Sequence, residues 1–484
     1  MPIALWWESL VFTSIMIGSF SMPIVLILLL SGALLFTLYF GFANVRYFPL
    51  SIRIVRGQYD EVERDENGED GEVNHFQALA TAVSGTVGLG NIAMVAVAIS
   101  IGGPGATFWM ILAGLLGMSS KFVECTLGVK YRHLAADGKV FGGPMYYLSR
   151  GMEERGWKRL GKVLSIIFAL MCIGASFGGG NAFQSNQAAA QIVERSGWQS
   201  DASGLIIGVL IAIVVGIVII GGIKRIAKVT EKVVPLMAAI YVLAALTILV
   251  LQFSLIDDAF ALIFQEAFTP RASITGGFVG VMIQGLRRAA FSNEAGAGSA
   301  AIAHAAVQTK FPASEGLVAL LEPFIDTVVI CTMTALVIII FNLNGEFAYG
   351  DVVNDEVLLT ASSERIGGVN LTSLAFDSAL PGFSYVLSIA VVLFALSTML
   401  SWSYYGQQAW DYLFGRHPKA ALAYKVLFLL FTVLGASVTM EAVIKFSDAM
   451  ILALVFPNMI GLFFLFPLVK GELSRYLEAI NVKK

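Results

Sequence analysis

Glycine and polar residues interrupt an apolar segment of this sequence in a pattern suited to ion binding. The segment TAVSGTVGLGNIA, residues 81–93, carries Gly85, Gly88, Gly90 and Asn91 within a stretch long enough to cross a bilayer. Glycine costs a helix interior about 1 kcal/mol relative to alanine, so this density predicts a helix that is broken at mid-membrane. A broken helix presents free N–H groups at one new end and free carbonyl groups at the other. Such ends together can hold a carboxylate and a cation side by side.

A second interrupted segment repeats the pattern in the other half of the chain. The segment RRAAFSNEAGAGSAAIA, residues 287–303, aligns with the first at a constant offset of 208 residues, which pairs Ser84 with Ser292 and Gly90 with Gly298. Irregular backbone at membrane depth is tolerated only where it lines a buried or water-filled cavity. Corresponding interruptions in two halves of one chain indicate a secondary transporter that binds its cargo between repeats.

Composition places the chain in a membrane. Of its 484 residues 57% are hydrophobic and 13% are charged, which is typical of a polytopic membrane protein. We therefore expect the lipid bilayer as its surroundings, no nucleic acid, since no basic tract is present, and no obligate protein partner. The cysteines lie in apolar runs and predict free thiols that pack as small hydrophobes, at Cys125, Cys172 and Cys331. The histidines fall near predicted segment ends and suggest interfacial positions, at His75, His133, His304 and His417.

Apolar segments of about 20 residues predict eleven spans, at about 23–43, 76–100, 106–129, 163–193, 204–222, 233–253, 274–303, 316–341, 378–413, 422–440 and 446–469. The first is an extra helix, and the other ten divide into two five-helix repeats, residues 76–253 and 274–469. Because five is odd, the second repeat enters from the opposite side. The predicted fold is an all-α polytopic membrane protein with one extra N-terminal helix and a 5+5 inverted repeat that contains two discontinuous helices.

The remaining segments flank these spans. Residues 1–22 lack the early basic residues of a signal peptide and predict an interfacial segment. Residues 44–75 carry eight carboxylates between Asp60 and Glu72 and predict an acidic, solvated cytoplasmic loop; residues 470–484 form a tail. Connections assigned to the cytoplasm hold 23 Lys and Arg against 4 outside. This asymmetry predicts an outside N-terminus and a cytoplasmic C-terminus.

Ionisable residues within predicted spans are functional candidates, because charge at that depth is costly. They include Glu124, Glu294, Asp326 and the pair Arg287 and Arg288. Lys121 and Glu124 lie three residues apart on one helix face, which predicts that they pair with each other. Glu294 follows the second break directly. We expect it to be structural, accepting hydrogen bonds from exposed backbone N–H groups or pairing with a basic group.

An enzyme is the first alternative to a transporter. Residues 88–93 fit the dinucleotide fingerprint G-x-G-x-x-A, which requires a preceding strand and an acidic residue about 20 positions later. No Asp or Glu occurs between Val73 and Val123. The fingerprint is therefore excluded, and the chain is not expected to be an enzyme.

Several motifs together carry a resemblance to a known family. They are TAVSGTVGLGNIA, GGPGATFW (102–109), GGPMYYL (142–148), GGGNAFQSNQ (178–187), AAFSNEAGAGSA (289–300) and SWSYYGQ (401–407). VGLGN resembles the first broken helix of the neurotransmitter:sodium symporters with the LeuT-type fold. As a set, the motifs look like the alanine or glycine:cation symporter family, the sodium:alanine symporters. That family has a LeuT-type five-plus-five core with one extra helix before it.

The resemblance implies a substrate site at the two breaks. Its backbone amides receive the substrate carboxylate at the first break, around Gly85, Thr86, Gly88 and Gly90. Phe291 and Ser292 cover the substrate at the second break, Gln184 contacts it with Asn186 nearby, and Trp402 closes one wall. The residues alone leave a second reading open, since Gln184 and Asn186 could merely tie helices together.

The resemblance also implies a sodium site, in which the carbonyls of Ser84 and Val87 join the hydroxyls of Ser397 and Thr398. Asn91 matches the amide ligand of a second sodium site in the wider superfamily. From the residues alone, the two hydroxyls could instead bond back to their own helix.

We interpret the chain as a symporter that couples inward movement of Na⁺ to uptake of a small neutral amino acid, alanine or glycine, by alternating access. Its expected location is a bacterial-type plasma (inner) membrane. Proton coupling stays open as an alternative for the same cargo. A channel needs no paired breaks in two halves, and an amino-acid sensor would be expected to carry a signalling domain, so both are weaker readings.

Overall fold

The computed structural model of the chain describes residues 2–17, 20–64, 71–198, 200, 202–271 and 273–481. Its N-terminal part consists of a small hairpin, several short helices and one apolar helix of 16 residues, α2. In chain order these elements are α1 (Pro2–Val11), β1 (Ser14–Ile17), β2 (Phe20–Pro23), α2 (Ile24–Tyr39), α3 (Ala43–Arg46), α4 (Phe48–Val55) and α5 (Asp60–Glu63).

The part of the chain before residue 270 continues with a well-capped helix, which leads into the first break. Asn74 accepts a hydrogen bond from the Gln77 amide at 2.9 Å, and Gln77 accepts one from the Asn74 amide at 3.2 Å, a reciprocal cap that fixes the start of α6. The elements are α6 (His75–Thr86), η1 (Gly90–Met94), α7 (Val95–Gly102), α8 (Gly105–Lys130), β3 (His133–Leu134), β4 (Val140–Phe141), α9 (Pro144–Tyr146), η2 (Tyr147–Gly151), α10 (Met152–Glu154), α11 (Lys158–Phe177), η3 (Gly178–Ala182), α12 (Phe183–Ser196), α13 (Ser203–Ile219), α14 (Gly222–Leu251), η4 (Phe253–Leu255) and α15 (Ile256–Phe268).

The part of the chain after residue 276 contains the other interrupted helix. Its elements are α16 (Gly277–Asn293), α17 (Ala300–His304), α18 (Pro312–Val318), α19 (Leu321–Pro323), η5 (Phe324–Cys331), α20 (Thr332–Phe341), η6 (Asn342–Asn344), β5 (Phe347–Val353), β6 (Glu356–Leu359), β7 (Arg365–Gly367), α21 (Gly368–Ala379), α22 (Ser384–Phe414), α23 (Pro418–Ser437), α24 (Met440–Ala453) and α25 (Val455–Ala479). Three small antiparallel sheets were not expected for an all-α fold: the two-stranded β1–β2 and β3–β4 and the three-stranded β5–β6–β7. They are short connections outside the long helices.

Length and composition agree with a multi-pass membrane protein. Among the described residues, seven helices are long and apolar enough to span a bilayer, and the bent pair 75–86 and 90–102 makes an eighth. Shorter apolar helices at 24–39 and 203–219, with the interrupted segment 277–304, bring the set into line with the eleven spans expected.

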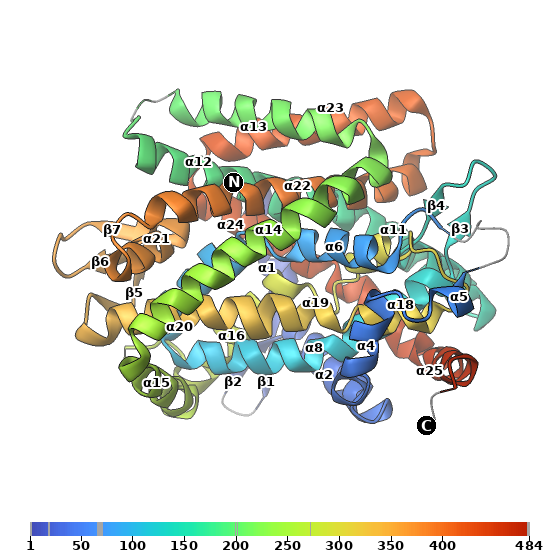
Figure 1. The fold of residues 1–484 in the computed structure, drawn as a ribbon, viewed down its shortest axis with the longest axis horizontal. Helices are drawn as coiled ribbons and strands as arrows, with labels where there is room; N and C mark the ends of the chain where they lie inside the picture. Colours follow the sequence, from blue (N-terminus) through green and yellow to red (C-terminus); the bar gives the residue numbers. More distant parts are fainter. Residues whose placement is uncertain are drawn as a thin grey trace.

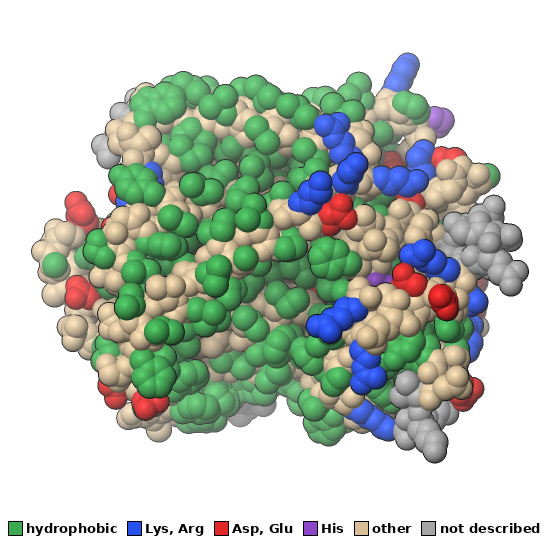
Figure 2. Space-filling model, in the orientation of Figure 1, with side chains coloured by type: hydrophobic (Ala, Val, Ile, Leu, Met, Phe, Trp, Pro, Cys, Tyr) green, Lys and Arg blue, Asp and Glu red, His purple; other side chains and the backbone are tan. Residues whose placement is uncertain are grey.

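The long helices lie between two ends of the molecule that carry the short strands (Figure 1). The β5–β7 sheet lies at one end, and β3, β4 and α5 lie at the other. Between the ends the visible surface is mostly hydrophobic, and Lys and Arg side chains gather toward the end that carries α5 and β3–β4 (Figure 2). Exposed side chains such as Leu210 of α13 and Leu243 of α14 belong to this apolar belt, which is the surface that lipid requires.

One carboxylate of the acidic connection departs from the solvated loop that its composition predicted. Residues 60–63 of the connection form α5, and Glu63 is fully buried. Residues 65–70, which hold four of the eight carboxylates, lie outside the described residues. A partner for Glu63 inside the helix bundle explains the difference, and it is described with the site.

Candidate functional site

The first break lies between α6 and η1, whose flanking helices are bent by 49°. Side chains satisfy the amides freed there: Gly88 N donates to Asn91 Oδ1 at 2.9 Å, and Leu89 N donates to Gln184 Oε1 at 3.1 Å. Gln184 Nε2 in turn donates to the Gly179 carbonyl at 2.9 Å. The structure therefore brings Gln184 to the break, where it ties the exposed backbone to the α11–α12 segment. Asn91 takes the Gly88 amide that the family resemblance assigns to a substrate carboxylate.

Helix α22 passes directly against the first break. A Cβ atom added to Gly88 would lie 2.3 Å from Thr398 Oγ1, and one added to Gly85 would lie 2.9 Å from Tyr405 Oη. Glycine is thus required by close approach at these positions. Both hydroxyls are buried and lack a hydrogen-bond partner within the described part of the chain. An unpaired buried hydroxyl is costly, which makes these two oxygens available to a ligand.

The expected sodium ligands meet where α6 crosses α22, but they differ in availability. Ser84 Oγ donates to the Ser397 carbonyl at 2.6 Å, and Val87 is fully buried beside it at the end of α6. Ser397 Oγ donates back to the Phe394 carbonyl at 2.9 Å. The Thr398 hydroxyl has no such bond within the described residues. Thr86 Oγ1 resembles Ser397 instead, because it donates back to the carbonyls of Ala82 and Val83.

The second break requires left-handed backbone. Helix α16 ends at Asn293, and Glu294, Gly296 and Gly298 follow with φ values of 54°, 92° and 85°. Glycine adopts such angles without strain, so the GAG pattern has a direct backbone cause. The two breaks face each other, because a Cβ atom on Gly90 would lie 3.6 Å from both Phe291 Cδ1 and Ser292 Cα.

Asp326 joins the two breaks through neutral donors. Asn91 Nδ2 donates to Asp326 Oδ1 at 2.7 Å, while Ser292 Oγ and Thr327 Oγ1 donate to Asp326 Oδ2 at 2.8 and 2.7 Å. The carboxylate is fully buried. Asn91 and Ser292, expected as ligands, are thus brought together, with Asp326 between them.

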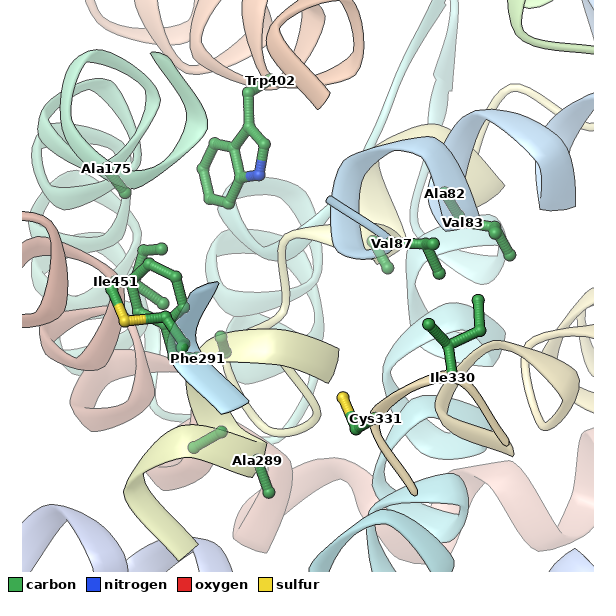
Figure 3. Close-up of a cluster of buried hydrophobic side chains, with 14 of the residues drawn as sticks. Ala82, Val83, Val87, Ala175, Ala289, Phe291, Ile330, Cys331, Trp402 and Ile451 are labelled. Carbon is green, nitrogen blue, oxygen red and sulfur yellow. The ribbon is translucent and has the colours of Figure 1, made fainter. Parts of the chain in front are cut away.

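Trp402 connects the breaks on another side. Its indole Nε1 donates to the Gly85 carbonyl at 3.2 Å and to Glu294 Oε1 at 3.1 Å. Figure 3 shows the indole of Trp402 and the ring of Phe291 among the apolar side chains around the broken helices. Glu294 also accepts a short hydrogen bond from Ser299 Oγ. The described contacts of Glu294 are therefore to side chains, not to the backbone N–H groups or basic group that we expected.

Asn186 lies away from the breaks. Its Nδ2 donates to the carbonyls of Gly435 and Val438 at 3.0 and 2.7 Å, which fastens α12 to the end of α23. Asn186 lies two residues after Gln184 on α12, so the two side chains point about 200° apart and Gln184 is the one that reaches the break. These bonds agree with the alternative that Asn186 ties helices together, and its role at the substrate stays a prediction.

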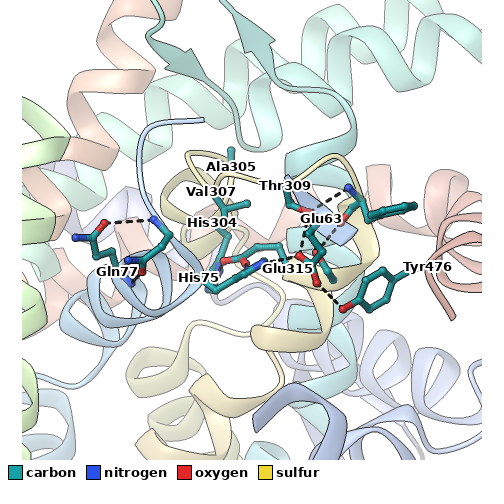
Figure 4. A network of polar contacts seen from close by, with 12 residues as sticks. Glu63, His75, Gln77, His304, Ala305, Val307, Thr309, Glu315 and Tyr476 are labelled. Atoms are coloured by element: carbon teal, nitrogen blue, oxygen red, sulfur yellow. Dashed lines mark hydrogen bonds and ion pairs between the residues drawn. The ribbon is translucent and has the colours of Figure 1, made fainter. Parts of the chain in front are cut away.

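The intramembrane charges pair differently from the prediction. Lys121 Nζ lies 3.0 Å from Glu322 Oε1, whereas Glu124 accepts a hydrogen bond from Asn458 at 2.8 Å. The residues three apart on α8 thus find separate partners on other helices. His75 and His304 are also buried, not interfacial, and they join Glu63 and Glu315 in a polar network (Figure 4).

Two features were not predicted from the sequence: Tyr405 beside the first break and the polar network. Tyr405 lies three residues after Trp402 in SWSYYGQ, and that helical spacing places both on one face of α22. The members of the network in Figure 4 come from distant segments, so no spacing along the sequence could have indicated that they lie together.

The crystal structure of MhsT in complex with L-phenylalanine is similar in fold. It matches 82% of this chain and 99% of its own length, with a TM-score of 0.54 and 16% sequence identity. The match shows a shared fold, the multi-pass helical LeuT type, in which this chain places its two facing helix breaks. Membership of a transporter family makes the chain a transporter and not an enzyme.

The chain belongs to the sodium:alanine symporter family, whose model matches residues 8–484. The sodium/alanine symporter AgcS of Methanococcus maripaludis is 38% identical over 457 residues, 94% of each chain. The amino-acid carrier protein AlsT of Bacillus subtilis is 35% identical over 382 residues, 78% of this chain and 74% of its own length.

Proposed function

We propose that this protein takes up a small neutral amino acid, alanine or glycine, by symport with Na⁺. The observation that carries the proposal is the meeting of two broken helices, the first of which packs against the hydroxyl of Thr398, a group unpaired within the described residues. Helix ends supply partial positive charge for a substrate carboxylate and carbonyl oxygens for a cation. The names of AgcS and AlsT support the same class of cargo.

The amino acid would bind between Phe291 and Trp402, with its carboxylate at the amides around Gly85 to Gly90. Its own carboxylate would compete with Asn91 for the Gly88 amide. Close packing favours a small side chain, because a Cβ atom on Gly179 would lie 2.3 Å from Ile451 Cδ1 and 3.5 Å from Phe291 Cζ.

The sodium ion would bind between α6 and α22, at Thr398 Oγ1 and the carbonyls of Ser84 and Val87. Ser397 would contribute only if its hydroxyl left the Phe394 carbonyl. Binding of cation and carboxylate is coupled because each charge stabilises the other, and such coupling is reciprocal. This mutual stabilisation is the basis of symport in the proposal.

Cavities at the two ends of the bundle suit alternating access. One of about 830 Å³ is lined by residues such as Gln187, Glu364 and Met440, near the β5–β7 sheet. Another of about 500 Å³ is lined by Glu72, Tyr404, Gln408 and other residues near β3–β4. Burial raises the pKa of the Glu72 carboxyl, which accepts a hydrogen bond from Val140 N at 2.8 Å. We assign the β5–β7 end to the outside.

The orientation rests on charge. Lys and Arg gather toward the end with α5 and β3–β4 (Figure 2), and basic connections favour the cytoplasm. This assignment puts the N-terminus outside and the C-terminus inside a bacterial-type plasma membrane.

Uptake of labelled alanine into proteoliposomes tests the proposal. An inward Na⁺ gradient is compared with an inward H⁺ gradient at matched membrane potential. Accumulation driven by Na⁺ alone supports sodium symport at Thr398. Accumulation driven by neither gradient contradicts the proposed cargo.

Proton coupling is the second candidate, favoured by Asp326 and Glu294. Both carboxylates are buried and receive hydrogen bonds from neutral side chains. A buried carboxylate is stabilised by a cation or by its own proton. Accumulation driven by H⁺ alone in the same assay would favour these residues as proton carriers.

A further inference from the structure

Six buried ionisable side chains form a chain on the side assigned to the cytoplasm, and Figure 4 shows the part of it that contains Glu63, His75, His304 and Glu315. Acid and base alternate along it, and each residue comes from a different element. The order is Glu63 of α5, His75 of α6, Glu315 of α18, His304 of α17, Glu322 of α19 and Lys121 of α8. None of the six residues is more than 5% exposed. Such an arrangement restricts where a proton can reside.

His75 faces a carboxylate at each ring nitrogen. Its Nε2 lies 2.6 Å from Glu63 Oε2, and its Nδ1 makes a short contact with Glu315 Oε2. A neutral imidazole has only one N–H group, and an ionised carboxylate has none to offer. Both contacts can be hydrogen bonds only when the unit of His75 and its two carboxylates holds one more proton. The geometry thus describes a proton-binding site.

The rest of the chain makes the proton costly to lose. His304 Nδ1 lies 2.5 Å from Glu315 Oε1, and its Nε2 lies 3.5 Å from Glu322 Oε2. With both imidazoles protonated, three cations including Lys121 face three carboxylates. Removal of one proton leaves a buried carboxylate without its cation, and such unpaired charges strongly destabilise the packing around them.

The proton site lies on α6, which we take as an element that moves in the proposed alternating access. His75 is the first residue of α6, the half-helix before the first break. Its partners are held by other helices: Tyr476 of α25 donates to Glu63 Oε1 at 2.5 Å, and Glu315 belongs to α18. A swing of α6 relative to α5 and α18 that opens the site toward the cytoplasm would separate His75 from both carboxylates.

We propose that His75, held between Glu63 and Glu315, is a proton-operated latch that releases its proton to the cytoplasm when α6 opens. The proposal rests on the alternating access and orientation proposed above. Other charged groups on elements packed against α6 or joined to the chain are Glu231 of α14, Glu124 of α8, Asp326 of η5 and Glu294. Because opening and proton release are linked, a higher cytoplasmic pH favours the open state.

A cysteine on α6 reports this opening. Thr81 is 1% exposed and packs against Thr230 of α14, with 3.2 Å between the hydroxyl oxygens, so Thr81→Cys is a small change at a buried position. The full-length protein in proteoliposomes is labelled from the cytoplasmic face with a membrane-impermeant maleimide. Labelling rates at about pH 6.5 and about pH 8.5 are compared with those of a free thiol, which removes the intrinsic effect of pH.

One linked proton can change the corrected rate by up to about tenfold per pH unit. We expect a clear rise with pH in Thr81→Cys, no rise when His75→Gln is added, and a rise shifted to lower pH with Glu63→Gln, which removes one anion that holds the proton. His133→Gln, at the same end but outside the chain of six residues, is the matched control and should behave like the parent. An equal rise with and without His75, or no rise in the parent, would overturn the latch.

Alanine binding separates this proposal from the proposed function. Na⁺-dependent binding of labelled alanine is measured on the same samples, and it also verifies that each variant is folded. Loss of binding in the parent would contradict the cargo, while a pH-dependent rate that requires His75 would still support the latch. Normal binding with a flat labelling rate in the parent would contradict the latch alone.

Discussion

Thr398→Val separates sodium binding from folding more sharply than any other substitution at the breaks. Valine matches threonine in shape but lacks the hydroxyl. Thr398 Oγ1 is buried and has no hydrogen-bond partner within the described residues, so its removal breaks no bond there. The ligand-free protein should therefore be as stable as the parent or more stable.

The magnitude follows from the hydroxyl's proposed role. Losing a contact between a neutral oxygen and a charged group costs about 1.5–3 kcal/mol. Each 1.4 kcal/mol corresponds to about a tenfold change in affinity, so half-saturating Na⁺ should rise by roughly one to two orders of magnitude. Ser397→Ala should have a smaller effect on Na⁺, because its hydroxyl is already engaged with the Phe394 carbonyl.

Two measurements test this reasoning on the same purified samples. Sodium titration of labelled-alanine binding gives the half-saturating concentration, and thermal unfolding without Na⁺ gives the stability. An unchanged sodium requirement in Thr398→Val would refute Thr398 as a ligand. A large loss of stability without Na⁺ would refute the claim that its hydroxyl is unpaired.

Three further substitutions test other contacts. Gly180→Ala should lower the free energy of unfolding by about 1–3 kcal/mol through overpacking, because the new Cβ would lie 2.2 Å from Trp402 Cγ; an unchanged unfolding temperature would show that the helices have room to part. Asn186→Ala removes two bonds between helices and should cost about 1–3 kcal/mol without changing alanine affinity, and a selective loss of affinity would restore it to the substrate site. Glu294→Ala should lower both thermal stability and alanine uptake, and more so than Glu294→Gln, which keeps an acceptor for the Trp402 indole; equal behaviour of the two would contradict that bond.

The sequence predicted the two breaks well because their causes are local. Glycine density weakens a helix wherever it occurs, and left-handed backbone at Gly296 and Gly298 needs glycine regardless of the rest of the fold. The fold class follows from the same segments and from hydropathy. Short hairpins such as β1–β2 were not predicted, since four-residue strands leave too little pattern to separate from a loop.

The polar partners could not be predicted because they depend on contacts between distant segments. Glu63 looked solvated among its acidic neighbours, yet His75 and Tyr476 hold it inside the bundle. Asn186 and Gln184 looked equivalent in one polar run, and only their directions from α12 separate them. Lys121 forms its ion pair with Glu322, about 200 residues away in the sequence, and not with Glu124 on its own helix.

The two sides of the site are held by different chemistry. Next to the second break, Asp448 of α24 lies 2.7 Å from Arg287 and 2.9 Å from Arg288 of α16. Arginine keeps its charge at any physiological pH, so the free energy needed to separate Asp448 from the two arginines stays the same across that pH range. The proposed latch uses histidine, whose charge changes near neutrality once it is separated from its two carboxylates. If the Asp448 cluster must open toward the outside and His75 toward the cytoplasm, then cytoplasmic pH acts on only one half of the cycle, the release of cargo into the cell.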